Sequence, residues 1–191
     1  VSRISSSITH WKHCAVPAPR ALPPAPNKVH RGPMALSQHV RLARVLALAV
    51  PALLLGGAYL SQYGFGLYPC EMCWWQRWPH FAAVALALIA YAIAPVRLWT
   101  GLAALAILIS GGIGLFHAGV EYGWWQGVTS CAVVTGGGTG NALDDIMNTP
   151  LVRCDEPAWT LFGISLAGYN FLISTVAGLS ILALLGKDRR V

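Results

Sequence analysis

Four long apolar runs, separated by more polar connections, dominate the pattern along this chain. The runs cover residues 45–63, 74–94, 98–118 and 159–185. A helix needs roughly 20 apolar residues to cross a hydrocarbon core about 30 Å thick, and each run is long enough to do so. The pattern therefore predicts an all-α membrane protein built as a four-helix transmembrane bundle.

The connections between these runs differ in length. Residues 64–73 join the first two runs, and Pro95-Val96-Arg97 form a tight turn between the second and third. About 40 residues separate the third run from the fourth, and they include Gly136-Gly137-Gly138. Loops of that length often carry function. Within this loop, Asn141 is placed to cap a short helix.

The composition supports a membrane protein. Of the residues, 55% are hydrophobic and 10% are charged, whereas about a quarter are charged in a typical soluble domain. The formal net charge of +6 does not indicate a nucleic-acid partner, because residues 1–33 contribute +5 of it and contain no acid.

Residues 1–33 differ from the rest of the chain. They hold six of the twelve prolines and show no helical or strand periodicity, so we expect a disordered tail. Met34 begins a segment typical of the start of a membrane protein, which makes the tail a candidate start-site extension, with a targeting peptide as the alternative. Cys14 of this tail has no assigned role. Residues 34–191 would form the membrane domain.

The charges outside the tail predict how the helices are oriented. Basic residues flank the apolar runs on one side, and cytoplasmic loops carry the excess of Lys and Arg. We therefore expect both termini in the cytoplasm and both cysteine-containing loops in the periplasm of a bacterial inner membrane. The basic residues of the first side are Arg41, Arg44, Arg97, Lys187, Arg189 and Arg190.

All four cysteines outside the tail fall in the two outer loops, two in each. They are Cys70, Cys73, Cys131 and Cys154. Disulfides persist in an oxidising compartment, so two structural disulfides are one interpretation. Four cysteines are also a possible ligand set for zinc, although the second pair lacks close C-x-x-C spacing.

The spacing of the first pair favours redox chemistry. A disulfide between Cys70 and Cys73 closes a very small ring and removes little entropy from the unfolded chain. C-x-x-C pairs open and close reversibly, with one sulfur activated as a thiolate. The helix that begins near Cys73 would stabilise negative charge on that sulfur.

Arg77 follows Cys73 by one helical turn and is a positive charge on the side where the orientation rule disfavours it. Snorkelling to lipid headgroups is the simplest explanation. The alternative is that Arg77 stabilises negative charge on Cys73 or on a lipid-soluble electron acceptor such as a quinone. His117, near the outer end of the third run, is a second candidate to bind that quinone.

Several motifs resemble the disulfide bond formation protein B family, DsbB, over about residues 36–186. These are P-C-E-M-C-W-W-Q-R at 69–77, G-L-F-H-A-G-V-E-Y-G-W-W at 114–125, T-S-C at 129–131 and C-D-E-P-A-W-T-L-F-G-I-S-L-A-G-Y-N at 154–170. The vitamin K epoxide reductase-like proteins also combine a C-x-x-C with a loop cysteine pair, but there the loop pair comes first. An inert scaffold with two disulfides is the alternative from another class.

The resemblance implies a thiol-disulfide oxidoreductase that reoxidises a periplasmic DsbA-like partner and reduces ubiquinone or menaquinone. It implies redox disulfides Cys70–Cys73 and Cys131–Cys154. The partner would attack Cys131, Cys154 would exchange with Cys70, and Cys73 would pass electrons to the quinone beside Arg77. No metal is expected in such an enzyme.

Overall fold

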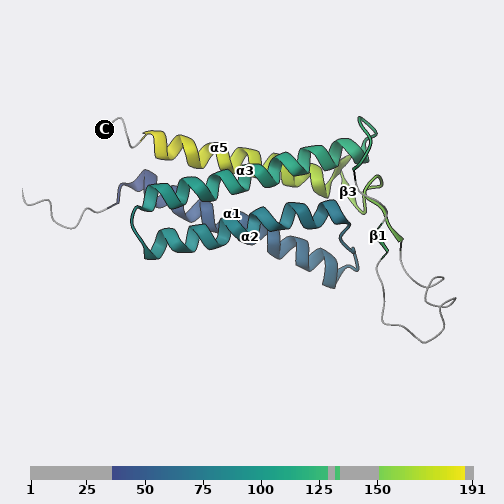
Figure 1. Ribbon diagram of the computed structural model, residues 1–191, viewed down its shortest axis with the longest axis horizontal. Helices are drawn as coiled ribbons and strands as arrows, with labels where there is room; N and C mark the ends of the chain where they lie inside the picture. Colours follow the sequence, from purple (N-terminus) through teal and green to yellow (C-terminus); the bar gives the residue numbers. More distant parts are fainter. Residues whose placement is uncertain (1–35, 129–131, 134–150, 188–191) are drawn as a thin grey trace, which may run out of the picture. The chain divides into compact units, whose positions relative to one another are not determined.

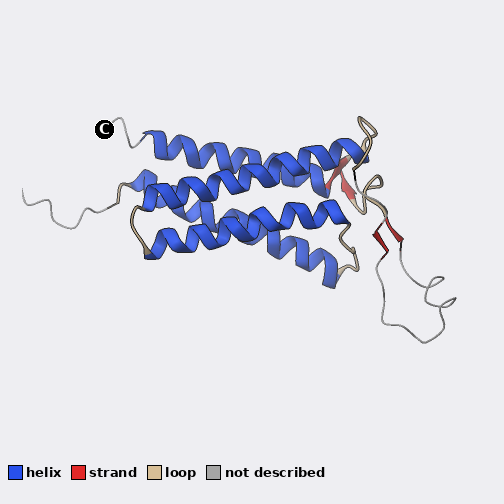
Figure 2. Cartoon of the chain, in the orientation of Figure 1, coloured by secondary structure: helices blue, strands red, loops and turns tan. Residues whose placement is uncertain are grey.

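Four helices run alongside one another in the computed structural model, which describes residues 36–128, 132–133 and 151–187 (Figures 1 and 2). The predicted tail, the predicted helix at Asn141 and the positions of Cys14 and Cys131 lie outside these residues. The helices are α1 (Gln38–Gly64), α2 (Glu71–Ala92), α3 (Val96–Glu121) and α5 (Leu166–Lys187).

The helices pack as a ring in which α3 contacts α2 and α5, and α1 closes the ring against α2 and α5. Small side chains fill much of the seam, and they allow close approach of the backbones, as is common between membrane helices. The buried core of this seam includes Ala43, Ala47, Ala83, Ala87, Ala103, Ala104, Ile107 and Ile181.

Three of the described helices, α1, α3 and α5, are long and apolar enough to cross a membrane. Of the four membrane-spanning helices predicted, three are therefore confirmed as long and apolar enough, and α2 is not. Helix α2 falls short because its first half carries the polar residues Gln76, Arg77 and His80. All three side chains are buried within the described part of the chain, where polar groups of membrane helices usually lie.

The helix boundaries follow from local caps. Helix α1 begins after Ser37, whose Oγ accepts a hydrogen bond from the N–H of Val40 at 3.3 Å. Helix α2 begins at Glu71, with Cys70 as its N-cap. Helix α3 extends past the predicted end to Glu121. These shifts place Cys73 inside the first turn of α2 and Glu121 in the last turn of α3.

The prediction that the fourth helix begins at residue 159 is wrong. Strands β3 (Thr160–Leu161) and β4 (Ile164–Ser165) form an antiparallel hairpin there, and α5 begins only at Leu166. The turn needs two residues with positive φ, and these are Phe162 at 50° and Gly163 at 76°. The apolar composition of this stretch concealed the hairpin.

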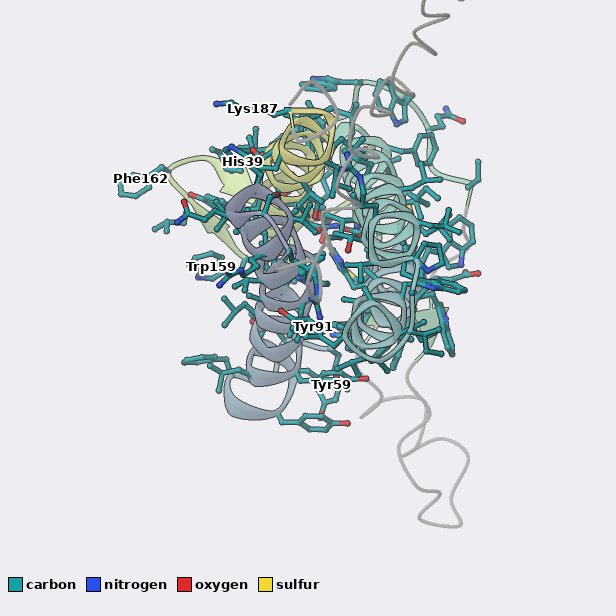
Figure 3. The ribbon with its side chains drawn as sticks, turned by 90° about the vertical axis from the view of Figure 1, so that its left-hand side faces the viewer. His39, Tyr59, Tyr91, Trp159, Phe162 and Lys187 are labelled. Atoms are coloured by element: carbon teal, nitrogen blue, oxygen red, sulfur yellow. The ribbon has the colours of Figure 1, made fainter. Side chains whose placement is uncertain are left out.

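Hydrogen bonds attach this hairpin to the helices. The hydroxyl of Tyr122 donates to the carbonyl of Gly163 at 2.9 Å and accepts from the N–H of Ser165 at 3.0 Å. Phe162, at the tip, projects away from the helices (Figure 3) and is 91% exposed.

A second small hairpin lies in the described part of the long loop. Strand β1 (Ala132–Val133) pairs with β2 (Leu151–Val152), and Ala132 lies opposite Val152. The start of α2, the end of α3 and both hairpins lie at the same end of the helices (Figure 1). The loop that contains Cys154 therefore meets the start of α2.

Candidate active site

The first component of the site is the cysteine pair at the start of α2. Cys70 caps the helix, and its Sγ accepts a hydrogen bond from the N–H of Cys73 at 3.3 Å. The two Sγ atoms are 3.1 Å apart, and both residues are thiols in this structure. The Cys70 thiol donates toward the Cys73 sulfur.

This arrangement makes the two sulfurs unequal. The hydrogen bond with Cys73, followed by burial, raises the pKa of the Cys70 thiol to about 12. Cys70 therefore keeps its proton, and that proton is directed at Cys73. A hydrogen bond donated to a sulfur stabilises negative charge on it. The geometry thus favours Cys73 as the more reactive sulfur of the reduced pair.

Cys154 provides a third sulfur at the same place. It lies two residues beyond β2 and is 7% exposed, in a buried cluster with Cys70, Met72 and Val120. The Sγ atoms of Cys70 and Cys154 and a ring nitrogen of His117 all lie within 4.8 Å of one another. Such a group is close enough for thiol-disulfide exchange, and its chemistry would also suit a soft metal ion.

His117 of α3 lies against the thiol pair. Its Nε2 is 3.5 Å from the Sγ of Cys70 and 3.6 Å from Oε1 of Glu121. The amide of Gln76 donates to Nδ1 at 2.8 Å, so Nε2 carries the ring hydrogen when the ring is neutral. The Nε2–H of His117 can therefore donate a hydrogen bond to the sulfur of Cys70 or to the carboxylate of Glu121.

A buried hydrogen-bond network continues from His117 into the helices. Gln76 Oε1 accepts from Asn170 Nδ2 at 2.8 Å, and Asn170 Oδ1 faces Nε2 of His80 at 2.9 Å. Ser110 Oγ donates to the backbone carbonyl of Gln76 at 2.8 Å. The network joins α2, α3 and α5, and it connects the sulfurs to the interior of the bundle.

A cavity of about 240 Å³ lies next to the cysteine pair. Apolar residues of α1, of α5 and of the loops before α2 and before β3 make up most of its wall. The polar side chains that line it include Cys73, Gln76, Arg77, His80 and Asn170. The first four of these occupy one face of α2, because they follow the helical pattern i, i+3, i+4 and i+7.

Arg77 is held firmly in this wall. It is 6% exposed, and its Nη1 donates to Oε1 of Gln62 at 2.7 Å while Nη2 donates to the carbonyl of Ala58 at 3.3 Å. Its guanidinium carbon lies 5.0 Å from the ring centre of Tyr59 and 4.8 Å from that of Trp74. A guanidinium with these partners faces the cavity rather than the aqueous surface.

Residues 40–184 of the chain match the family model of disulfide bond formation protein DsbB. The chain belongs to the DsbB family. It is 32% identical over 163 residues to disulfide bond formation protein B of Verminephrobacter eiseniae, covering 78% of this chain and 88% of the relative. No solved structure matches the chain.

Two further relatives extend the comparison. Disulfide bond formation protein B 2 of Pseudomonas syringae is 32% identical over 148 residues, covering 73% of this chain and 83% of the relative. An uncharacterised protein of Rickettsia prowazekii, RP370, is 25% identical over 139 residues, covering 70% of this chain and 81% of that protein. The resemblance of the motifs to DsbB is thus confirmed.

The structure brings three of the four expected cysteines of this DsbB family member together, Cys70, Cys73 and Cys154. It places Arg77 in the cavity wall beside Cys73. His117, expected beside the quinone, instead lies at the sulfurs and is not among the residues that line the cavity.

Sequence reasoning missed three polar residues of the site, Gln76, His80 and Asn170. Gln76 and His80 had a signal, since they fall on the helical face that carries Cys73 and Arg77. Asn170 had none, because it lies 94 residues from Gln76 along the chain and meets it only through packing of α5 against α2 and α3.

Proposed function

We propose that this chain is a quinone-dependent thiol-disulfide oxidoreductase that reoxidises a periplasmic DsbA-like protein and so supports disulfide bond formation. The observation that carries the proposal is the position of Cys73. Its sulfur lies 3.1 Å from that of Cys70, and its side chain also lines the apolar cavity that contains Arg77. One residue thus connects thiol exchange with a binding site for an apolar electron acceptor.

The membrane arrangement is part of the proposal. Four helices span the inner membrane of a bacterium, with α2 as the fourth span and its polar residues turned into the bundle. Both termini lie in the cytoplasm and both cysteine loops in the periplasm. The start of α2 and the loop that follows β2, which carry the described cysteines, lie at one end of the helices (Figure 1). This grouping supports the orientation, as does the distribution of Lys and Arg in the sequence.

Electrons enter through the second cysteine pair. One thiolate of the reduced partner attacks Cys131 of a Cys131–Cys154 disulfide, forms a mixed disulfide and releases Cys154 as a thiolate. The partner's second thiolate then attacks its own mixed-disulfide sulfur. The partner leaves oxidised and Cys131 and Cys154 are reduced. The pairing of Ala132 with Val152 supports this cysteine pair, since it places the residue after Cys131 opposite a residue two positions before Cys154.

The second exchange takes place at the buried cluster. The Cys154 thiolate attacks Cys70 of a Cys70–Cys73 disulfide, which forms a Cys70–Cys154 bond and releases Cys73 as a thiolate. Attack of Cys131 on Cys154 then restores the outer disulfide and leaves Cys70 and Cys73 reduced. The distance of at most 4.8 Å between the Cys70 and Cys154 sulfurs supports a direct exchange.

The residues of the cluster assist this exchange. His117 Nε2, 3.5 Å from the Cys70 sulfur, is positioned to donate a hydrogen bond to Cys70 when that sulfur is released as a thiolate. Glu121, whose Oε1 lies 3.6 Å from the same ring nitrogen, would favour the tautomer that carries its hydrogen on Nε2. His117 is thus assigned here to the sulfurs rather than to the acceptor.

The cavity suits ubiquinone or menaquinone as the electron acceptor. A cavity of about 150 Å³ holds benzene, so about 240 Å³ has room for a substituted ring. A bound quinone accepts two electrons and two protons. Arg77 would donate hydrogen bonds to a ring oxygen, Cys73 would lie beside the ring, and the aliphatic wall would exclude water.

The test is reconstitution of the purified full-length chain with a short-chain ubiquinone and a reduced DsbA-type protein, with quinone absorbance as the readout. We expect one quinone to be reduced for each pair of partner thiols oxidised. Cys73→Ser should abolish quinone reduction. Failure of the wild-type protein to reduce quinone, or full activity of Cys73→Ser, would overturn the proposal.

A further inference from the structure

His80 is a buried cavity residue that neither the thiol exchange nor the Arg77 contacts use. It lies one turn after Arg77 on α2, is 3% exposed, and lines the same cavity. Burying an imidazole is costly unless both ring nitrogens find partners. The partners of its two nitrogens therefore show what the residue is built to do.

The Nε2 side of the ring is fixed by Asn170, whose Oδ1 lies 2.9 Å away. The orientation of this amide is defined, because Asn170 Nδ2 donates to Oε1 of Gln76 at 2.8 Å and to the carbonyl of Ser110 at 3.2 Å. The atom facing His80 is therefore an acceptor, and Nε2 must carry the hydrogen. In the neutral ring, the lone pair then lies on Nδ1.

The Nδ1 atom is buried and has no hydrogen-bond partner among the residues that the structure describes. No neighbouring side chain in the described cavity wall donates a hydrogen bond to this atom. Arg77 donates to Gln62 and to the carbonyl of Ala58 and makes no hydrogen bond to Nδ1 of His80. Since His80 lines the cavity, an unpaired acceptor on its ring is complementary to a ligand that brings an O–H or N–H group.

We propose that Nδ1 of His80 accepts a hydrogen bond from the hydroxyl group of the reduced acceptor, the quinol, and so makes the cavity selective for the product of the reaction. This inference rests on the quinone-dependent function proposed above. Arg77 can only donate, so it recognises a carbonyl or hydroxyl oxygen in either redox state. His80 in its neutral form can only accept at Nδ1, and a quinone has no hydrogen to give it.

Two substitutions separate the two sides of the ring. His80→Gln places an amide near the position of Nε2, where it keeps the contact with Asn170 and removes Nδ1. His80→Asn places its amide near Nδ1 and loses the contact with Asn170. A purely structural role for His80 predicts that His80→Gln behaves as the wild type. The proposed role predicts that His80→Asn preserves ligand selectivity better.

The experiment measures dissociation constants of a short-chain ubiquinone and of its quinol by anaerobic equilibrium dialysis. The full-length, oxidised protein in detergent is used, since it has no reactive thiol pair to reduce the probe. One hydrogen bond to a buried acceptor corresponds to about a tenfold change. We expect His80→Gln to weaken quinol binding about tenfold relative to quinone binding, and His80→Asn to keep the wild-type ratio within about threefold.

An unchanged quinol-to-quinone ratio in His80→Gln, or equal changes in both variants, would overturn the role of His80 while leaving the quinone function intact. If wild-type protein binds neither probe, the quinone function fails, and this inference fails with it. Nitrogen-15 NMR of labelled histidine in the wild type needs no variant. Quinol but not quinone should shift the Nδ1 resonance of His80, and no shift would contradict the proposal.

Discussion

Cys70 and Cys73 are three residues apart but have different chemical surroundings. The hydrogen bond with Cys73, together with burial, raises the pKa of Cys70 from its ordinary value of 9.0 to about 12. In reduced protein between pH 7 and 9, we therefore expect iodoacetamide to alkylate Cys73 well before Cys70. Mass spectrometry of quenched time points measures both rates. Faster alkylation of Cys70 would contradict the assigned order.

The same shift makes the stability of the reduced protein depend on pH. The folded state holds the Cys70 proton more tightly than the unfolded chain does, so the contribution is fully present below pH 9.0. It is lost as the pH rises from there toward about 12. The melting temperature of the reduced wild-type protein should fall over this pH range more steeply than that of Cys70→Ser.

Arg77 holds two partners on α1 and has a proposed role in binding the electron acceptor, and substitution can test both. Arg77→Ala removes the proposed donor to the acceptor, so we expect the apparent KM for quinone to rise about tenfold or more. It also leaves the partners on α1 unpaired, which should cost about 1–3 kcal/mol of folding free energy.

The matched control for Arg77→Ala is Arg153→Ala, which removes an arginine that is 44% exposed and paired with Asp155. Surface substitutions of this kind usually change stability by less than about 0.5 kcal/mol, and quinone kinetics should stay unchanged. Equal effects of the two variants on quinone KM would reduce Arg77 to a general electrostatic contribution.

The site residues that could be identified from the sequence are those that lie close to one another along the chain. The C-x-x-C spacing and the charge one turn later singled out Cys70, Cys73 and Arg77. The position of His117 against a sulfur depends on how α3 packs beside α2, and Asn170 depends on α5. Contacts between distant segments leave no periodic signal in one sequence.

At the scale of elements, close packing of α3 against α5 positions Asn170. A Cβ atom at Gly114 would come within 3.0 Å of the carbonyl of Ala167 and 3.1 Å of Asn170 Nδ2. We therefore expect Gly114→Ala to force these helices apart, cost about 1–3 kcal/mol and slow quinone reduction. Unfolding curves and the quinone assay measure the two effects.

Gly112 offers the matched control on the same helix. A Cβ atom there would meet nothing within 4 Å, and Ala favours a helix over Gly by roughly 1 kcal/mol. Gly112→Ala should be neutral or slightly stabilising. If both alanine variants have the same effect, helix propensity rather than packing determines it.

The presence of four helices was predictable from the lengths of the apolar runs. The hairpin before α5 and the polar character of α2 were not. The β3–β4 hairpin is made of apolar residues, and only the backbone at Phe162 and Gly163 distinguishes it from the start of a helix. The mean hydropathy of α2 is lowered by polar side chains that are buried inside the bundle. Hydropathy averaged over a segment does not show which way its polar side chains face.

At the scale of the whole molecule, one end of the bundle places the proposed thiol-exchange site next to an apolar cavity. The polar network through Gln76 and Asn170 connects the two sites, with His117 at the sulfurs and His80 in the cavity wall. The family relationship accounts for the cysteines. The different positions of the two histidines, from which their proposed roles follow, come from the packing of α2, α3 and α5.

The central claim is that Cys154 and Cys70 exchange directly at the buried cluster, and disulfide mapping of Cys73→Ser tests it most directly. In this variant, the Cys70 thiolate can attack Cys154 of the outer disulfide and release Cys131 as a thiol. Mass spectrometry of acid-quenched, alkylated protein should reveal a Cys70–Cys154 disulfide with Cys131 alkylated. Detection of Cys131–Cys154 alone, with Cys70 alkylated, would contradict the account.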